Sequence, residues 1–386
     1  MKIGFLGYKF ENENLGCVAL TYATIDILHD IFKDNLTIVN ITDVHEDMSF
    51  ARKYFPEIKF IEQMYTMKGR LMKLDRCTKE QITSCDAVLD ITFGDNFSDI
   101  YLPKFVQRTT HMKLCVERLG VPLLLMPQTI GPFRSKPLLL QALLAIAKSK
   151  RVYSRDVLSS EFVHKYLKKK DVYVTTDLAL ALPFDKSQKV KSSKIRVGLN
   201  VSGLLWKGGF HTQNQFGLKV DYKSYIETLI NELLKEDKYE IHIIPHVTDV
   251  SANAQDGDLA CVEYLKHKFP KLIFAPTYTS PIDVKTYIST MDVFSGARMH
   301  STVAAFSSEV ATIPFSYSRK FKGLYDHLNY NFIISGTELD TQHAVELTLE
   351  YISNYIELHE KVTQSMSQVR IELDKFKDDL KKTLVK

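Results

Sequence analysis

The strongest constraint on the fold is a repeated alternation of short apolar runs with longer amphipathic stretches, which stops at a polar segment, 183–194, and then restarts. Short, continuous apolar runs are typical of strands that are buried on both faces of a parallel sheet, and the stretches between them have helical periodicity. This alternation predicts an α/β fold with helices on both faces of mostly parallel sheets. Because the pattern restarts, we predict two Rossmann-like domains with a cleft between them.

The expected elements follow the same alternation in both halves. In the first half we expect strands at 2–7, 36–41, 87–92, 122–126, 151–154 and 172–175, and helices at 18–31, 103–119, 137–148 and 159–168. In the second half we expect strands at 195–201, 239–245, 272–274 and 291–295, and helices at 222–234, 257–268 and 281–290. A charged amphipathic pattern from 341 onward predicts one or two long helices. The expected domains are 1–184, 195–340, and C-terminal helices at 341–386 that pack back across the junction.

Length and charge narrow the class of protein. A chain of 386 residues is long enough to form two domains, given roughly 100–200 residues per domain. With 45% hydrophobic and 25% charged residues it has the composition of an ordinary globular protein. The net charge of +4 is only mildly basic, and the lysines are scattered apart from 168–170 and the pair at 191 and 194. A nucleic-acid partner needs a denser basic stripe with aromatic residues between, so we expect none.

The cysteines and the apolar runs indicate the cellular compartment in which the protein is expected. The five cysteines include no CxxC pair and no metal-ligand spacing, and their odd number favours thiols in a reducing compartment. The N-terminal apolar run lacks the features of a signal peptide, and no other stretch approaches the ~18 apolar residues that span a bilayer. We therefore expect a cytoplasmic protein without a bound metal. Its basic residues are compatible with peripheral binding to a membrane.

Arg298 and His300 stand where a short apolar strand is expected to turn into a helix. In an open α/β sheet, ligands bind beyond the carboxyl ends of the strands, where the next helix offers free backbone N–H groups to an anion. Arg298 can present a planar fork to a carboxylate or phosphate, and His300 can move a proton near neutral pH. The spacing is equally compatible with an arginine in a surface ion pair and a histidine satisfied in the wall between domains.

The first strand is followed by a polar loop that contains Asn14 and Gly16 and leads into a helix. Its glycines are too far apart for the dinucleotide fingerprint, and no P-loop lysine closes it, so NAD and P-loop nucleotide binding are not favoured. Asn14 and Gly16 can shape a helix N-terminus that meets a substrate. An ordinary Asn/Gly turn with a helix cap fits the same residues.

Three more polar segments of the first domain follow expected strands. Gly94, Asp95 and Asp99 come after the strand at 87–92, and these carboxylates can accept protons from sugar hydroxyls or serve as loop and cap residues. Gln128 precedes a Gly-Pro turn that fixes a tight bend. Arg155 is a second candidate cation, with a local contact to the neighbouring aspartate as the alternative.

The second domain adds further candidates after its own strands. His246 and an aspartate three residues later form an HxxD pattern, which is a poor metal signature without more ligands. Tyr317 and Lys320 follow another apolar run and add a hydroxyl group and a cation. Each of these signals is weak, but all of them accumulate at the carboxyl ends of expected strands.

Taken in order, these segments resemble the polysaccharide pyruvyl transferase family over roughly residues 1–330. The matching segments are Asn14 to Gly16, Gly94-Asp95 with Asp99, 128–132, 154–156 with Ser159, Thr176-Asp177, Arg298-Met299-His300, and 314–320. The chain departs from the family pattern at Cys17, where an acid is common, and at 93–95, where the family has a run of glycines. Both departures lie in the N-terminal, acceptor-side half.

The resemblance implies a GT-B-like architecture and transfer of the enolpyruvyl unit of phosphoenolpyruvate onto a sugar as a cyclic ketal. The acceptor is expected to be a capsule or exopolysaccharide unit or its lipid-linked precursor, and no cofactor or metal is needed. We expect Arg298, Arg155 and Lys320 to bind the anionic donor and His300 to protonate its methylene carbon. Asp95 or Asp99 is expected to accept the hydroxyl proton or orient the sugar. Further substrate contacts are expected from Tyr317, Asn14, Gly16, Gln128 and His246.

Two other functions fit the same pattern. A GT-B-type glycosyltransferase that uses a nucleotide sugar also has two Rossmann-like domains, since fold does not determine function. A non-catalytic carbohydrate-binding protein, inactivated by changes such as Cys17, is the alternative from outside the enzymes.

Overall fold

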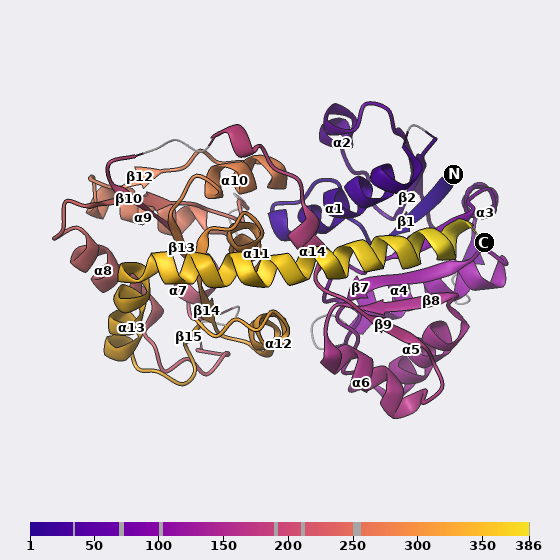
Figure 1. Cartoon of the computed structure of the whole chain (residues 1–386). Helices are drawn as coiled ribbons and strands as arrows, with labels where there is room; N and C mark the ends of the chain where they lie inside the picture. Colours follow the sequence, from indigo (N-terminus) through magenta and orange to yellow (C-terminus); the bar gives the residue numbers. More distant parts are fainter. Residues whose placement is uncertain are drawn as a thin grey trace. The chain divides into compact units, whose positions relative to one another are not determined.

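A computed structural model describes residues 1–33, 35–68, 73–99, 103–188, 192–209, 213–249 and 256–385 (Figure 1). The chain divides into two compact units. Unit 1 comprises Met1–Glu11, Leu20–Leu178 and Ile371–Lys386, and unit 2 comprises Asn12–Ala19 and Ala179–Arg370. Both units are α/β structures built on parallel sheets, which confirms the predicted fold class.

Within the described residues, unit 1 has a seven-stranded parallel sheet in the order β3-β2-β1-β6-β7-β8-β9. The strands are β1 (Lys2–Leu6), β2 (Thr37–Thr42), β3 (Lys59–Met64), β6 (Ala87–Asp90), β7 (Leu123–Gln128), β8 (Arg151–Ser154) and β9 (Val172–Val174). A short antiparallel pair is formed by β4 (Met67–Lys68) and β5 (Lys73–Leu74). The helices are α1 (Leu15–Phe32), α2 (Ser49–Tyr54), α3 (Arg76–Thr83), α4 (Pro103–Arg118), α5 (Lys136–Lys148) and α6 (Val157–Tyr166).

Unit 2 has a six-stranded parallel sheet among its described residues, in the order β12-β11-β10-β13-β14-β15. The strands are β10 (Ile195–Asn200), β11 (Tyr239–Ile243), β12 (Ile273–Phe274), β13 (Val293–Gly296), β14 (Ala311–Ser316) and β15 (Ile334–Ser335). The helices are α7 (Gly203–Trp206), α8 (Tyr222–Leu233), α9 (Leu259–Lys268), α10 (Pro281–Ile288), α11 (Met299–Ser307), α12 (Arg319–His327), α13 (Thr341–Ser353) and α14 (Tyr355–Val385). Short 3₁₀ turns lie at Leu178–Ala181 and Lys186–Gln188.

Local sequence explains why these elements begin where they do. The central strands β6 and β7 are buried at every position, as expected for strands covered by helices on both faces. Helix α6 begins at Asp156, whose Oδ1 accepts a hydrogen bond of 2.7 Å from the backbone N–H of Ser159. Helix α10 begins in the same way, with Ser280 Oγ accepting from the N–H of Ile282.

The strand order in each sheet locates its ligand-binding edge. In unit 1 the order reverses between β1 and β6, and in unit 2 it reverses between β10 and β13. Loops that leave such a pair of strands diverge to opposite faces of the sheet, so the carboxyl edge opens there. The loop after β6 is tightly wound, since Thr92, Phe93 and Gly94 all have positive φ. Gly7, which follows β1, leaves no room for a side chain because a Cβ would lie 2.7 Å from the backbone nitrogen of Thr92.

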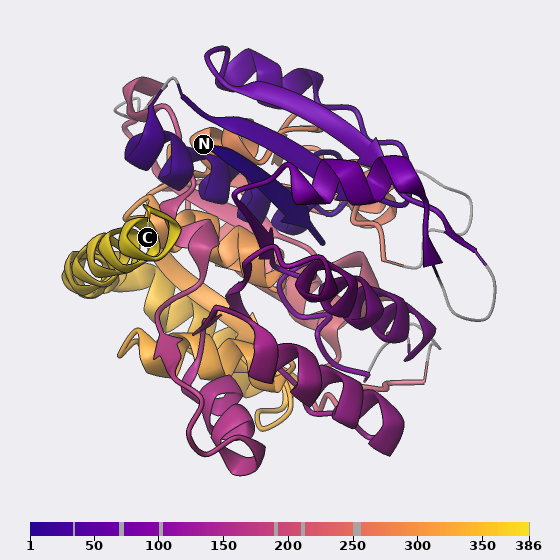
Figure 2. The same ribbon diagram turned by 90° about the vertical axis from the view of Figure 1, so that its right-hand side faces the viewer.

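The one or two long helices predicted from 341 onward are α13 and α14. Helix α14, seen almost end-on in Figure 2, contributes Tyr355–Arg370 to unit 2 and the remainder to unit 1. Within unit 1, Asp379 accepts hydrogen bonds from Arg151 Nε, at 3.0 Å, and from the Tyr153 hydroxyl, at 2.8 Å. Lys377 forms an ion pair with Asp30 at 2.8 Å. The last turns of α14 are therefore part of the unit 1 fold.

Helix α1 corrects one expectation. Its 18 residues are long and apolar enough to span a membrane by length and composition, although no such stretch was predicted beyond the N-terminal run. In the structure, 67% of this window is buried inside the protein, as in the core helix of a globular domain. The cytoplasmic location stays a prediction.

Candidate active site

The carboxyl edge of the unit 2 sheet gathers polar side chains from four strand ends. Asn200 is the last residue of β10, His246 follows β11, Arg298 follows β13 and Tyr317 follows β14. Asn200 and Arg298 flank the point where the strand order reverses, and the backbone N–H of Arg298 donates to Asn200 Oδ1 at 3.0 Å. Unit 2 thus places its polar groups where open α/β sheets bind ligands.

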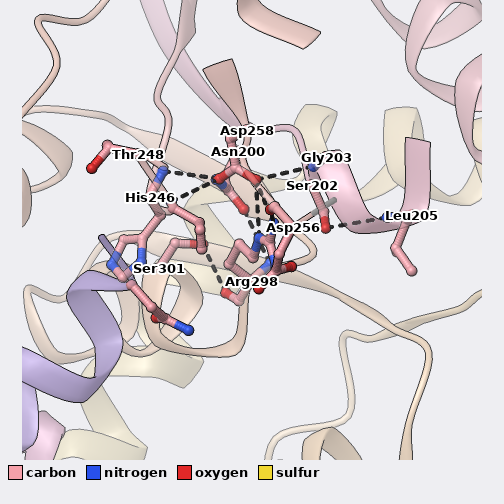
Figure 3. Close-up of polar contacts among 12 residues, drawn as sticks. Asn200, Ser202, Gly203, Leu205, His246, Thr248, Asp256, Asp258, Arg298 and Ser301 are labelled. Carbon is pink, nitrogen blue, oxygen red and sulfur yellow. Dashed lines mark hydrogen bonds and ion pairs between the residues drawn. The ribbon is translucent and has the colours of Figure 1, made fainter. Parts of the chain in front are cut away.

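Asp258, just before α9, is the hub of this edge (Figure 3). Its side chain is fully buried. One carboxylate oxygen, Oδ2, accepts from the backbone N–H groups of His246 and Val247 at 3.0 Å each. The other, Oδ1, accepts from the N–H of Gly203 at 3.0 Å and from the Arg298 guanidinium. One carboxylate therefore fixes the loops that follow β10, β11 and β13.

The Arg298 guanidinium is almost fully buried and balanced by two carboxylates. Its Nε and Nη2 donate to Asp258 Oδ1 at 3.0 and 2.7 Å, and Nη1 donates to Asp256 Oδ1 at 2.5 Å. Nη2 also donates to the Asp256 carbonyl. Burial would lower the pKa of Arg298, but the charges of Asp258 and Asp256 outweigh it and raise that pKa. Arg298 is thus in a buried ion-pair network, and any role in donor binding must accommodate these two acids.

Gly16 and His300 are in direct contact. A Cβ built on Gly16 would lie 2.2 Å from His300 Nδ1, so only a hydrogen atom fits between the backbone and the imidazole ring. Asn14 caps this turn, with its Oδ1 accepting from the N–H of Gly16 at 3.1 Å. Asn14 also forms an antiparallel bridge with Val247, which ties the first loop of the chain to the loop after β11. The structure therefore brings together three predicted site residues from distant parts of the sequence.

His246 is buried beside the same centre. Its carbonyl accepts from the N–H of Leu15 at 3.4 Å, and only 2% of its surface is exposed. Burial, with the nearby charges of His300 and Arg298, lowers the pKa of His246 to about 3, although Asp258 opposes the shift. His246 is consequently neutral around pH 7.

Tyr317 and Lys320 complete the predicted residues of unit 2. Tyr317 is buried, its ring lies 4.8 Å from that of Phe216 and 5.5 Å from that of Phe321, and its hydroxyl interacts electrostatically with Arg298. Lys320 is partly exposed in the first turn of α12. Tyr317 therefore belongs to the cluster around Arg298.

In unit 1, a second arginine centre lies at the carboxyl edge. Arg155 follows β8 and is 5% exposed. Its Nη1 donates to Asp177 at 2.8 Å, and its Nε donates to Thr129 Oγ1 at 3.0 Å. Burial would lower the pKa of Arg155, but Asp177, Asp95 and Asp156 together raise it. The structure thus places Arg155 and Asp95 in one electrostatic cluster.

Gln128 points into the interior of unit 1. Its Nε2 donates to the Asp90 carbonyl at 2.8 Å and to Asp90 Oδ2 at 3.1 Å, and its side chain is fully buried. Asp90 forms a fully buried ion pair with Lys113, whose ammonium group also donates to Thr92 Oγ1. These contacts give Gln128 a structural role below the tight turn after β6.

Asp99 fastens a loop. Its two carboxylate oxygens accept from the backbone N–H groups of Arg134 and Ser135, at 2.7 Å each, and the side chain is buried. This arrangement holds the segment that leads into α5. Both carboxylate oxygens of Asp99 are therefore engaged by the backbone.

The described part of the chain contains no group of three or more His, Cys, Asp or Glu residues placed to hold a metal ion. No disulfide joins the cysteines.

The sequence interpretation missed Asp256 and Asp258. Asp258 stands just before a helix, which gives it the local signature of an ordinary N-cap, and nothing in its neighbourhood points to an arginine 40 residues later. Only the order of the strands brings the two side chains together.

The sequence matches a family of known proteins over most of its length. A model of the family "Polysaccharide pyruvyl transferase" matches residues 14–319, which include every candidate residue except Lys320. No curated protein matches the sequence.

The solved structures share the fold at low sequence identity. HepE from Anabaena, in complex with UDP, has 13% identity, a TM-score of 0.62 and coverage of 100% of both chains. UDP-GlcNAc 2-epimerase from Neisseria meningitidis, bound to UDP-GlcNAc, has 12% identity and a TM-score of 0.56, with 97% of this chain and 100% of that chain covered. An α,α-trehalose 6-phosphate synthase from Burkholderia multivorans has 10% identity and a TM-score of 0.56, with 99% and 96% covered. These likenesses confirm the predicted GT-B-like architecture.

Proposed function

Because the chain belongs to the polysaccharide pyruvyl transferase family, and is thus a transferase, we propose that it moves the enolpyruvyl unit of phosphoenolpyruvate onto two vicinal hydroxyls of a sugar. The methylene carbon gains a proton and becomes a methyl group, which leaves an oxocarbenium-like centre at the neighbouring carbon. The two hydroxyl oxygens bond to that carbon and lose their protons, and phosphate leaves with one proton. The product is a pyruvate ketal, and the reaction needs no other cofactor.

The contact between Gly16 and His300 carries this proposal. It holds the imidazole in the first turn of α11, where backbone N–H groups and the helix dipole favour a bound anion. An anionic donor at that point stabilises the protonated imidazole, so His300 can give its proton to the methylene carbon. General acid catalysis of this kind is worth roughly 10²–10⁴-fold in rate.

The other residues divide into ligand-binding and positioning groups. Arg298, balanced by Asp256 and Asp258, positions the start of α11 and therefore His300. The anionic donor is then bound by the N–H groups of that turn, with Lys320 and Tyr317 as further donors of hydrogen bonds.

In unit 1, Asp95 is the better candidate to orient an acceptor hydroxyl, because both oxygens of Asp99 already hold the backbone before α5. Arg155 adds fixed positive charge beside Asp95.

The test is a phosphate-release assay with phosphoenolpyruvate and a panel of sugars, followed by mass spectrometry of the product. The wild-type protein is expected to release phosphate and add one pyruvyl ketal. His300→Gln is expected to lower kcat by at least about 10²-fold with little change in the affinity for phosphoenolpyruvate. His343→Gln is a matched control, because His343 is an exposed histidine at the start of α13, outside the site.

Two outcomes would contradict the proposal. If UDP-sugars raise the thermal midpoint and phosphoenolpyruvate does not, the protein is a nucleotide-sugar enzyme. If His300→Gln is as active as His343→Gln, His300 is not the general acid.

A further inference from the structure

The segment 134–170, which contains α5, β8 and α6, is rich in basic residues. It holds ten Lys or Arg residues and two acidic residues, a net charge of +8, whereas the whole chain has only +4. The rest of the chain therefore has a net charge of −4. Arg151 and Arg155 are ion-paired with acids, so the exposed basic residues of the segment are Arg134, Lys136, Lys148, Lys150, Lys165, Lys168 and Lys169. The view that the lysines are scattered is therefore incomplete.

The same segment exposes apolar side chains. Of the twelve large apolar side chains that are exposed in the described residues, five lie on α5 and α6, which together have only 23 residues. They are Leu140 (68% exposed), Leu144 (46%), Val157 (50%), Leu158 (41%) and Tyr166 (41%). Singly exposed leucines are ordinary, but such a concentration marks an interaction surface.

Helix α5 arranges these groups as an amphipathic stripe. Leu140 and Leu144 are four residues apart and share one face of the helix, with Lys136 before them and Lys148 after them. Lys136 and Lys148 are both exposed, and the helix contains no acidic residue. Its outer face is therefore apolar in the middle and basic at both ends, which is the pattern of helices that lie on membrane surfaces.

Helix α6 extends the same face. The connections β7-α5-β8 and β8-α6-β9 step in one direction across the sheet, so right-handed crossovers place both helices on one side of it. Figure 1 shows α5 and α6 on the same side of β8 and β9. Lys165, Lys168 and Lys169 are exposed here, with Glu161 as the exposed acid.

We infer that this α5–α6 face, formed by the outer side chains of residues 134–170, binds the surface of an anionic membrane. Exposed leucines enter the boundary between headgroups and acyl chains, while lysines and arginines attract anionic headgroups, each worth about 1 kcal/mol near the surface. Docking to a second copy through this face is disfavoured, because a two-fold contact places the same charged patch on both sides.

The location of this face has a consequence for the acceptor, which rests on the proposed function. Helix α6 begins two residues after Arg155, so the first turn with Val157 and Leu158 lies at the same carboxyl edge as the Arg155 centre. A membrane bound there brings lipid-linked sugars to that edge. This location agrees with the lipid-linked acceptor that the family resemblance implies.

The test is sedimentation of the full-length protein with phosphatidylcholine vesicles, with and without phosphatidylglycerol. The wild-type protein is expected to bind the anionic vesicles and to dissociate as salt is raised. Leu140→Ser/Leu144→Ser is expected to weaken binding about tenfold, and Lys136→Gln/Lys148→Gln to weaken it by a similar factor. The matched control is Ile356→Ser/Ile371→Ser on α14, where the exposed fractions, 63% and 49%, are similar.

Three results would overturn the inference: equal effects of the two serine pairs, equal binding to vesicles without anionic lipid, or a wild-type dimer that the leucine changes convert to monomers. Binding lost in the lysine pair but unchanged in a folded leucine pair would show a purely electrostatic surface.

The assay contains no phosphoenolpyruvate, so vesicle binding without pyruvyl transfer would refute the proposed function alone. Transfer to a soluble sugar without vesicle binding would refute this inference alone.

Discussion

The two units place an arginine at comparable positions, directly after a strand of a doubly wound sheet, but surround it differently. Arg155 in unit 1 donates to one carboxylate and one hydroxyl group. The Arg298 guanidinium in unit 2 makes four hydrogen bonds, which join it to Asp256 and Asp258. The same residue at a comparable point of the fold can therefore be held by one carboxylate or by two, and we expect the more extensively bonded Arg298 to contribute more to stability.

The largest expected effect is on unit 2. Asp258→Asn leaves the Arg298 guanidinium buried with part of its charge uncompensated, and weakens the acceptor of three backbone N–H groups. We expect the free energy of unfolding to fall by about 3–5 kcal/mol. Urea unfolding followed by fluorescence of Trp206 measures it, because this is the only tryptophan and lies in unit 2.

The control for that measurement is Asp256→Asn. The Asp256 side chain is 33% exposed and makes one side-chain contact with Arg298, so a loss of only about 1 kcal/mol is expected. Equal losses in the two variants would show that Asp258 is not the hub.

A pair of Arg→Lys changes addresses the comparison directly. Lysine keeps the charge but loses the planar fork. Arg298→Lys is expected to lower the free energy of unfolding of unit 2 by about 2–3 kcal/mol, because hydrogen bonds between charged groups are lost. Arg155→Lys is expected to lower kcat/KM roughly tenfold to a hundredfold while stability changes less. Reversed patterns, with activity more sensitive at Arg298 and stability at Arg155, would exchange the two roles.

The last contrast is a gradual one, a difference in how the two units respond to each unit of acidification. The pKa of His246 falls from 6.5 to about 3 on folding, so below pH 6.5 the unfolded chain binds more protons and unit 2 loses up to about 1.4 kcal/mol per pH unit. Burial raises the pKa of Glu117 in unit 1 from 4.5 to about 7, and a folded state that binds the extra proton gains stability as pH falls from 7 to 4.5.

Acidification should thus weaken unit 2 and strengthen unit 1. Trp206 fluorescence in urea at a series of pH values reports unit 2, and His246→Gln is expected to reduce the slope below pH 6.5. An unchanged slope in that variant would mean that other groups cause the acid sensitivity.

The sequence predicted the strand ends well but could not predict what surrounds them. The boundaries of β8 and the start of α10 were predicted to the residue, because apolar runs and a Ser-Pro start are local signals. The strands β3, β4, β5, β14 and β15 and the helices α2, α3, α7 and α12 were not predicted. The strand β3 is only partly buried, so it lacks a continuous apolar run.

The geometry of the site was harder to predict than the fold, because it depends on contacts between segments that lie far apart in the sequence. That Gly16 lies under His300 depends on two segments 284 positions apart, and neither carries a local sign of the other. Gln128 and Asp99 were assigned to the substrate because they follow a strand, yet both make structural contacts. Position after a strand predicts the edge on which a side chain lies, but not the direction in which it points.

The last turns of α14 determine when unit 1 can complete its fold during synthesis. Lys377 and Asp379 contact Asp30 and the β8 residues Arg151 and Tyr153, so unit 1 contains residues from both ends of the chain. Domains generally fold during synthesis from the N-terminus onward. Here the unit that is translated first receives its final helix last, after all of unit 2 has left the ribosome. A nascent chain stalled before residue 371 therefore has every residue of unit 2 but an unfinished unit 1.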